Sequence, residues 1–391
     1  MMNEKPLIHP TRGARRLLAT CAHCRALALA VAAGAGLALY SPPLPAQVPS
    51  SYIAVEYARL DNPGATTVIR SINSAGEVAG GFQRGRRRGS SALIFLANNN
   101  VEDVAGEQGV GNTANSIAYG INDQGEVAGA FNTDVSLRPF RALRKAGLQE
   151  LALPPGSNGG VAYSINQQGE AAGYVSGASG LRPVWWSRRG DVQLLQSIDN
   201  ATAKALDLND RGDFVGVSGA DPKGAVAWPR KGGVVSLGTL PGYTHSEAVS
   251  VNQNGAIVGV ATGASGFPSR TRALLWRSAG AAVQDLGTLP GGTDSRSRAV
   301  NNRGEVVGTS TSTDGVRAFI WTASTGMLDL NKLVTVPGLV MTDALGINKR
   351  GGILVMGHDG QAQAQAQAHG NSDEHADHHA ARRIFVLRPQ Q

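Results

Sequence analysis

Short apolar runs separated by turn-forming residues recur along residues 52–387. The runs are four to six residues long, rich in Val, Ile and Trp, and bounded by Gly, Asn and Pro, which is typical of β-strands. Several runs, such as AFIW at 318 and GAVAW at 224, are apolar on both faces. A sheet with one solvent-facing side would alternate more regularly. The pattern therefore predicts an all-β chain whose sheets are covered on both sides.

The clearest repeat is Asn-x-x-Gly followed by a short apolar run, as in AVNNRGEVVG at 299. Its Asn falls at seven positions spaced 43 to 49 residues apart: Asn73, Asn122, Asn166, Asn209, Asn252, Asn301 and Asn348. An aromatic run, such as RAFIW at 317, and a Leu-rich stretch ending in Pro-Gly, such as VVSLGTLPG at 234, share this period. Four strands per unit of about 45 residues are typical of a propeller blade. A β-solenoid is the main alternative, but its rungs are usually shorter.

Seven units predict a seven-bladed β-propeller of four-stranded blades. The chain begins in a Leu-rich strand, 52–60, and ends in an aromatic strand, 383–387. We expect these two strands to lie in one blade, so that the N-terminal and C-terminal strands close the ring.

The repeated Asn and Gly predict a hairpin at each copy. Asn301 and Gly304 stand at the first and fourth positions that a type I turn prefers. A Gly in the left-handed conformation there gives a three-residue hairpin with a bulge. The recurrence of these two residues is thereby explained without any chemistry.

The order L-x-x-L-P-G, I-N-x-x-G-x-V-V-G and R-A-F-x-W resembles the bacterial extracellular repeats of the HAF family, over nearly all of residues 52–387. The His-Ala-Phe that names the family is absent, and Arg317-Ala318-Phe319 is the nearest match. The resemblance implies an exported protein. It supplies no catalytic residue, because the family motif is structural.

The N-terminal segment 1–46 is predicted to be an export signal. A basic n-region, 1–25, precedes an apolar h-region, 26–40, and cleavage is expected after Ala46. The apolar run is short for a membrane span, which is the alternative. Arg15-Arg16 leaves the choice between the general and the twin-arginine export routes open. We expect a periplasmic or extracellular protein with a single repeat domain, 47–391.

Cleavage changes both the cysteine content and the charge. Cys21 and Cys24 are the only cysteines, so the chain from residue 47 has none and cannot form disulfides. The net charge of +7 falls to +3, since 31 basic and 28 acidic residues remain. The basic balance is therefore no evidence for nucleic-acid binding.

Three groups of residues are candidates for binding. Five repeats place a carboxylate just after the turn Gly, and we expect these acids to be solvated, the alternative being a partial ring that binds cations: Glu77, Glu126, Glu170, Asp213 and Glu305. The loop RGRRRG contains four arginines that are either solvated or bind polyanions: Arg84, Arg86, Arg87 and Arg88. A low-complexity stretch, 361–382, is expected to be a disordered insertion whose histidines form at most a weak zinc or copper site: His369, His375, His378 and His379.

Catalytic motifs are not found in the sequence. His245, Ser246 and Glu247 form the nearest triad-like group, but adjacent residues on a strand point to opposite faces. The tryptophans recur near one repeat position, which favours core packing between blades over stacking on sugars. We expect no cofactor and no metal.

The predicted function is therefore a non-enzymatic, exported, monomeric binding or envelope-associated module. Its ligand is unknown, with an envelope polysaccharide or a protein as candidates, and its function is expected in irregular loops such as 84–89 and 263–271. The alternatives are a glycan-acting enzyme with carboxylates converging on the central channel and a structural surface protein. The sequence does not indicate which strand lines that channel.

Overall fold

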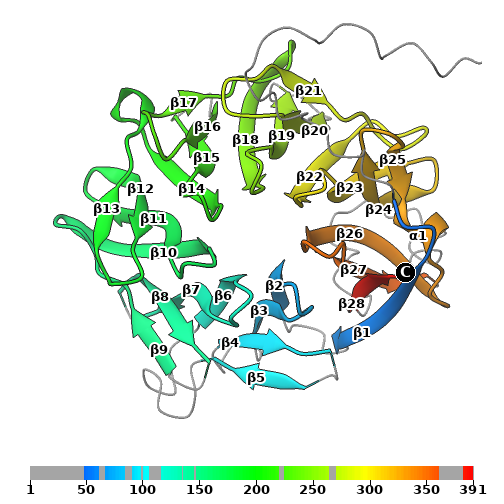
Figure 1. The fold of residues 1–391 in the computed structure, drawn as a ribbon, viewed down its shortest axis with the longest axis horizontal. Helices are drawn as coiled ribbons and strands as arrows, with labels where there is room; N and C mark the ends of the chain where they lie inside the picture. Colours follow the sequence, from blue (N-terminus) through cyan, green and yellow to red (C-terminus); the bar gives the residue numbers. More distant parts are fainter. Residues whose placement is uncertain are drawn as a thin grey trace, which may run out of the picture. The chain divides into compact units, whose positions relative to one another are not determined.

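Seven four-stranded antiparallel sheets form a ring in the computed structural model (Figure 1). The structure describes residues 48–60, 67–83, 90–97, 100–104, 116–133, 135–144, 147–219, 224–263, 270–360 and 382–390. The predicted export signal 1–46, the four arginines of loop 84–89 and the four histidines of the 361–382 insertion lie outside these residues. Within the described ranges, no helix is long and apolar enough to cross a membrane.

Each blade consists of four strands that lie side by side, with the first at the centre of the ring and the last on its outside (Figure 1). Blade 1 contains β2 (Thr67–Ile72), β3 (Val78–Gln83), β4 (Ser90–Phe95) and β5 (Val101–Asp103); blade 2 contains β6 (Ser116–Ile121), β7 (Val127–Asn132), β8 (Leu137–Leu143) and β9 (Gly147–Glu150). Blade 3 contains β10 (Ser157–Ile165), β11 (Ala171–Gly177), β12 (Gly180–Trp186) and β13 (Val192–Leu194); blade 4 contains β14 (Ala203–Leu208), β15 (Phe214–Ser218), β16 (Gly224–Trp228) and β17 (Val235–Ser236).

The remaining blades repeat this arrangement. Blade 5 contains β18 (Tyr243–Val251), β19 (Ile257–Gly263), β20 (Thr271–Trp276) and β21 (Val283–Asp285); blade 6 contains β22 (Ser295–Val300), β23 (Val306–Ser312), β24 (Gly315–Thr322) and β25 (Gly326–Asp329). Blade 7 contains β26 (Leu339–Ile347), β27 (Ile353–Asp359), β28 (Arg382–Pro389) and, as its outermost strand, β1 (Tyr52–Leu60). Two short helices, η1 (Ile198–Asn200) and α1 (Leu330–Leu333), interrupt the connections between blades.

The ring closes through strands from both ends of the chain, as predicted. β1 pairs antiparallel with β28 from Tyr52 opposite Pro389 to Leu60 opposite Arg382. The Arg383 guanidinium donates to both carboxylate oxygens of Glu56 across this pair, at 2.9 and 2.7 Å. Loss of either terminal strand would therefore expose the edge of the other and open the ring.

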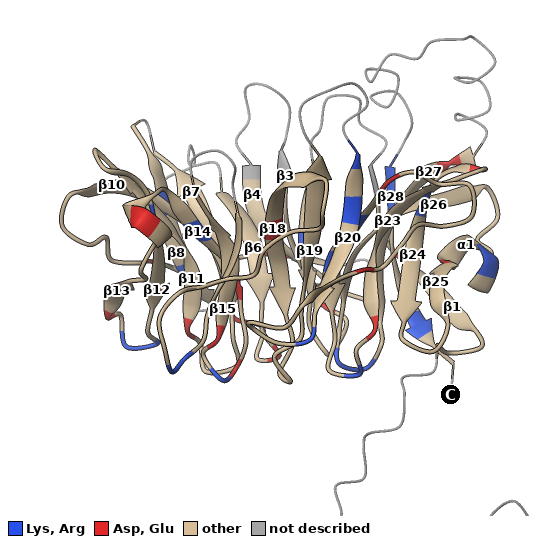
Figure 2. Ribbon diagram, turned by 90° about the horizontal axis from the view of Figure 1, so that it is seen from above, with Lys and Arg blue, Asp and Glu red and all other residues tan. Residues whose placement is uncertain are grey.

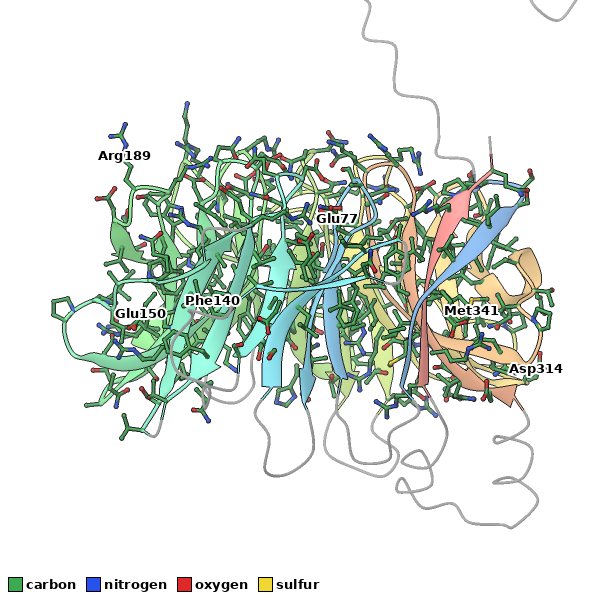
Figure 3. The ribbon with its side chains drawn as sticks, turned by 90° about the horizontal axis from the view of Figure 1, so that it is seen from below. Glu77, Phe140, Glu150, Arg189, Asp314 and Met341 are labelled. Atoms are coloured by element: carbon green, nitrogen blue, oxygen red, sulfur yellow. The ribbon has the colours of Figure 1, made fainter. Side chains whose placement is uncertain are left out.

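The hydrophobic core lies between neighbouring blades, where the third strands are buried on both faces. Trp186 and Trp276 are fully buried, and Figure 3 shows Phe140 and Met341 among the strands between the two ends of the ring. The Trp186 indole N–H donates to the Ala152 carbonyl, and the Trp276 indole donates to the Leu237 carbonyl, each at 2.7 Å. The tryptophans thus pack between blades, as the sequence predicted, and they also satisfy carbonyls in the connections.

The last Gly of the V-V-G phrase is required by close contact between the first two strands of a blade. A Cβ on Gly173 would lie 1.8 Å from the Val161 carbonyl oxygen, and one on Gly259 would lie 2.0 Å from the Glu247 oxygen. Only a residue without a side chain allows this approach.

Candidate functional site

The seven Asn hairpins lie at one end of the ring and form the turns that the sequence predicted. In the hairpin of blade 6, the Gly304 N–H donates to the Asn301 carbonyl at 3.0 Å, and Gly304 has a φ of 78°. The Asn301 side-chain oxygen accepts from the N–H groups of Arg303 and Glu305. We call this end the asparagine rim; Figure 3 places Glu77 and Arg189 on it and Asp314 toward the opposite end.

The same Asn side chains also join each blade to the next, a role that the sequence motif does not predict. Each side-chain amide donates to the backbone carbonyl of the next Asn around the ring: Asn73 to Asn122, Asn122 to Asn166, Asn166 to Asn209, Asn209 to Asn252, Asn252 to Asn301, Asn301 to Asn348, and Asn348 back to Asn73. The donor–acceptor distances are 2.8 to 3.3 Å. The result is a closed circle of seven hydrogen bonds around one mouth of the ring.

The expectation that the five repeated carboxylates are solvated is wrong for Glu126 and Glu305, which are buried, whereas Glu77, Glu170 and Asp213 are partly exposed. Each accepts a hydrogen bond from the Asn of its own hairpin, and they are Glu77, Glu126, Glu170, Asp213 and Glu305. Glu126 is 3% exposed and Glu305 is 1% exposed. An Asn amide has two N–H donors, so one serves the next blade and the other serves the carboxylate. The acids are therefore part of the rim's structure and not a free ring of cation ligands.

Basic side chains cover these acids on the outside of the asparagine rim. Arg188 reaches Glu126 of the neighbouring blade at 2.8 Å, and Arg303 contacts Glu305 at 2.7 Å. In each pair the guanidinium is more than 40% exposed while the carboxylate is buried. Figure 2 shows Lys and Arg together with Asp and Glu along the turns of this end.

Lys349 extends across blade 1 to pair with Asp123 of blade 2 at 2.6 Å. Burial disfavours the charged form of Asp123, but hydrogen bonds from Lys349 and Ser74 outweigh it and lower the pKa of this carboxyl. This ion pair joins blade 7, in which the ring closes, to blade 2 across blade 1.

A cavity of about 1360 Å³ occupies the centre of the ring and is lined mainly by the innermost strands, β2, β6, β10, β14, β18, β22 and β26 (Figure 1). In each of these strands the pairing register shifts near the hairpin. The shift lies between the residues four and two positions before the repeated Asn. The residue skipped by the shift, three before the Asn, lines the cavity in all seven blades. These seven bulge residues are Arg70, Tyr119, Tyr163, Leu206, Val249, Arg298 and Leu345. A β-bulge turns a side chain out of the regular alternation, and here it directs all seven toward the centre.

One wall of the cavity is aromatic and basic. The rings of Tyr119 and Tyr163 lie edge to face with centroids 5.3 Å apart, and Tyr174 of β11 lies 5.7 Å from Tyr163. The Lys204 ammonium lies 5.2 Å from the Tyr174 ring centroid. At the other end the Arg70 guanidinium is close enough to affect the pKa of both Tyr119 and Tyr163. Arg70, Tyr119, Tyr163 and Lys204 line the cavity, and Tyr174 contacts both Tyr163 and Lys204. We call these five residues the aromatic arc; it spans blades 1 to 4.

The tyrosines of the arc are held in the neutral form. Burial raises the pKa of Tyr119, Tyr163 and Tyr174 above the ordinary value for phenols, although Arg70 acts in the opposite direction on the first two. The Tyr163 and Tyr174 hydroxyls also hydrogen-bond to each other. At neutral pH the arc therefore offers phenol groups that both donate and accept, flanked by two cations.

The opposite wall is more apolar, with Leu206, Val249 and Leu345 at its bulges. Arg298 is paired with Asp343 at 3.0 Å, whereas Arg296 is exposed to the cavity. The cavity is thus divided into an aromatic, basic side and an apolar side.

Two carboxylates line the cavity, Asp207 and Glu247. Asp207 accepts hydrogen bonds from the Ser164 hydroxyl of blade 3, its neighbour Leu208 N–H, and the Val251 N–H of blade 5, at 2.7 to 2.9 Å. Burial raises the pKa of Asp207, against the effect of these hydrogen bonds. Both its oxygens are engaged, so Asp207 ties three blades together.

The triad-like residues do not act together. The Ser246 hydroxyl accepts from the Ala225 N–H and donates to the Gly238 carbonyl, both at 2.9 Å, between blades 4 and 5. His245 and Glu247 line the cavity. Among the described residues, no group of three or more His, Cys, Asp or Glu side chains could hold a metal ion.

The sequence did contain a signal for the cavity. The position three before the repeated Asn carries Arg, Tyr, Leu and Val in a phrase that otherwise changes little. A position that differs from copy to copy, inside a repeat whose other positions change little, indicates a side chain that the fold does not constrain. The register shift that turns this position inward could not be predicted from the residues.

Comparisons with known proteins identify the fold alone. No protein-family model matches the sequence, and no curated protein matches it. Among solved structures, virginiamycin B lyase from Staphylococcus aureus is similar with a TM-score of 0.52 and 11% identity, over 86% of this chain and 99% of that one. The β-propeller domain of the Trilobed protease from Pyrococcus furiosus has a TM-score of 0.50 and 9% identity, over 75% and 90%.

A structure from a study of two prolyl endopeptidases is also similar, with a TM-score of 0.50 and 10% identity, over 76% of this chain. The chain spans only 47% of that enzyme. At these identities the likeness establishes a β-propeller and no shared activity.

Proposed function

We propose that this protein is an exported, non-enzymatic binding module whose ligand occupies the central cavity. The observation that carries the proposal is the ring of seven bulge residues. The hairpins, the Asn circle and the V-V-G glycines repeat from blade to blade, whereas the side chains that the bulges turn into the cavity differ. A concave, asymmetric site built on a rigid scaffold is the usual form of a binding site.

The fixation of Asp207 supports binding over catalysis. Glycoside hydrolysis needs two free carboxyl groups, one to transfer a proton and one to act as base or nucleophile. Glu247 could serve as one, but the oxygens of Asp207 are occupied by backbone and hydroxyl donors from three blades. Burial between blades raises the pKa of Asp207. Its hydrogen bonds, and not this pKa, leave no oxygen free to exchange a proton with a ligand.

Export rests on the sequence of the N-terminal segment. The basic n-region, 1–25, and the apolar h-region, 26–40, predict a cleaved signal. A ligand in the cell envelope, either a polysaccharide or a protein, is then the expected partner. The resemblance to HAF repeats is consistent with a periplasmic or extracellular location, and that location remains a prediction.

The proposal is tested by screening the chain from residue 47 onward against an array of neutral oligosaccharides, acidic oligosaccharides and peptides. Val249→Trp, which adds bulk at a bulge residue facing the cavity, is the matched variant. We expect saturable binding of the wild type that Val249→Trp abolishes, and no release of reducing ends from bound saccharides. Binding that Val249→Trp leaves unchanged would place the site elsewhere, and turnover would show an enzyme.

A further inference from the structure

We infer that the ligand is an acidic saccharide, that is, a chain of sugar rings carrying carboxylate or sulfate groups, held on the aromatic arc. This inference rests on the proposed function, because it assigns the ligand class of the same cavity.

Tyr119 and Tyr163 provide ring faces and hydroxyl groups on one wall of the cavity, and Tyr174 packs against Tyr163. Tyr119, Tyr163 and Tyr174 are each half-buried and lie in a continuous series from blade 2 to blade 3. A phenol combines an apolar body with a polar tip, which suits a ligand that has both C–H faces and hydroxyl groups. A sugar ring has both.

The hydroxyl groups nearby extend this match. Ser71, Ser250, Thr202 and Thr262 also line the cavity. Since burial keeps the phenols neutral, the Tyr119 hydroxyl can donate to one sugar oxygen and accept from another sugar hydroxyl. The Tyr163 hydroxyl donates to Tyr174 and can still accept from a sugar hydroxyl.

The charge at the ends of the arc selects for an anion. Arg70 lies at the blade 1 end and Lys204 at the blade 4 end, and both face the same cavity. Arg296, on the opposite wall, adds a third cation. The negative charge that opposes these cations in the cavity is that of Glu247. Asp207 is hydrogen-bonded between blades, and Arg298 and Asp343 neutralise each other.

Hydrogen bonds between a guanidinium or ammonium and a carboxylate or sulfate are about twice as strong as neutral ones. In a confined cavity with low-dielectric walls, charges of one sign also raise the local concentration of the opposite ion. A neutral saccharide would leave Arg70 and Lys204 without such partners. The arc thus distinguishes acidic from neutral chains by charge and sugars from simple anions by its rings.

The test is calorimetric titration of the chain from residue 47 with a galacturonate oligomer, a sulfated oligosaccharide, a neutral maltose-type oligomer of equal length and an oligoglutamate. We expect the acidic saccharides to bind at least about tenfold more tightly than the neutral oligomer, since charge-assisted hydrogen bonds contribute that much or more. The sulfated and galacturonate arms identify which anion the site prefers.

Three variants in the cavity localise the effect, and a fourth outside it is the control. Arg70→Gln and Lys204→Gln should each weaken binding of the acidic oligomers about tenfold and leave the neutral oligomer unaffected. Tyr163→Ala should weaken both. Arg189→Gln, on the asparagine rim, removes the same charge outside the cavity and should change nothing (Figure 3).

The outcomes separate this inference from the proposed function. Binding of the neutral oligomer or oligoglutamate in preference to acidic saccharides, if lost in Val249→Trp, keeps the cavity site and overturns the acidic-saccharide assignment. Equal weakening by Arg70→Gln and Arg189→Gln would mean nonspecific charge attraction and overturns it as well. Binding of any probe that Val249→Trp does not affect overturns both.

Discussion

Replacing Asn252 by Ala removes one link of the Asn circle without removing a carboxylate contact, because Ala256 stands where five other blades have Glu or Asp. Asn252 is 5% exposed. Its amide donates to the Asn301 carbonyl at 2.8 Å, and its oxygen accepts from the N–H groups of Asn254 and Ala256 at 3.0 and 2.9 Å. The variant therefore loses three hydrogen bonds and leaves a small void at the joint between blades 5 and 6.

The expected loss is about 3 kcal/mol in the free energy of unfolding, at about 1 kcal/mol for each hydrogen bond. For the unit Pro45–Gln391, about 2.1 cal/mol/K per residue gives an unfolding entropy of about 0.7 kcal/mol/K near the melting temperature. The melting temperature should thus fall by about 4 °C, measured by calorimetry or by circular dichroism at the strand signal.

Two further variants divide this loss between the turn and the circle. Asn252→Asp keeps the oxygen that accepts from Asn254 and Ala256 but removes the donor to Asn301, so it should still lose at least about 1 kcal/mol. Asn254→Ala, the control, removes only an exposed hydrogen bond to the Asn302 carbonyl and should cost less than about 0.5 kcal/mol. An Asn252→Asp variant as stable as the wild type would refute the stabilising role of the circle.

Three other predictions concern the repeated Gly, the ion pair of the asparagine rim and the aromatic arc. Gly259→Ala should destabilise the protein by about 1–3 kcal/mol, because its Cβ would meet the Glu247 oxygen at 2.0 Å, whereas Gly224→Ala, whose Cβ has 3.9 Å of clearance, should be tolerated; equal melting temperatures would contradict this. The lowered pKa of Asp123 means that its ionised form stabilises the fold above the unfolded value of 3.8, and this contribution is lost as the pH falls through the folded pKa; denaturant titrations from neutral to acidic pH should show a shallower loss for Asp123→Asn, and parallel curves would count against it. The raised pKa of the three arc tyrosines keeps their phenols neutral in alkaline solution, so binding of an acidic oligosaccharide should be unchanged between about pH 8 and pH 9; a loss of binding over that range would contradict this.

The sequence predicted the blades well because strand period and turn chemistry are local. Asn301 and Gly304 stand at fixed positions of a tight turn, and the runs between them alternate or stay apolar as their burial requires. Ring closure by the strands at 52–60 and 383–387 followed from counting strands in each unit. These inferences needed no knowledge of contacts between blades.

Contacts between blades were the part that could not be predicted. The second role of Asn301, its hydrogen bond to the Asn348 carbonyl, depends on a neighbour 47 residues away in the sequence. The burial of Glu305 follows from that geometry and reverses the usual expectation for an exposed acid. Likewise Tyr163 faces the cavity because a bulge interrupts β10, and the residues around it do not encode the bulge visibly.

The proposed ligand occupies the cavity lined by the bulge residues. The chain from residue 47 contains no cysteine, so Leu206→Cys places a single thiol at one of these bulges. The most direct measurement is the rate at which a small maleimide labels this thiol, with and without a mixture of acidic and neutral oligosaccharides. Val135→Cys, at a position that is 92% exposed, is the control. We predict that the mixture slows labelling of Leu206→Cys and leaves Val135→Cys unchanged, whereas saturable binding of the mixture with an unchanged labelling rate at Leu206→Cys would contradict the proposal.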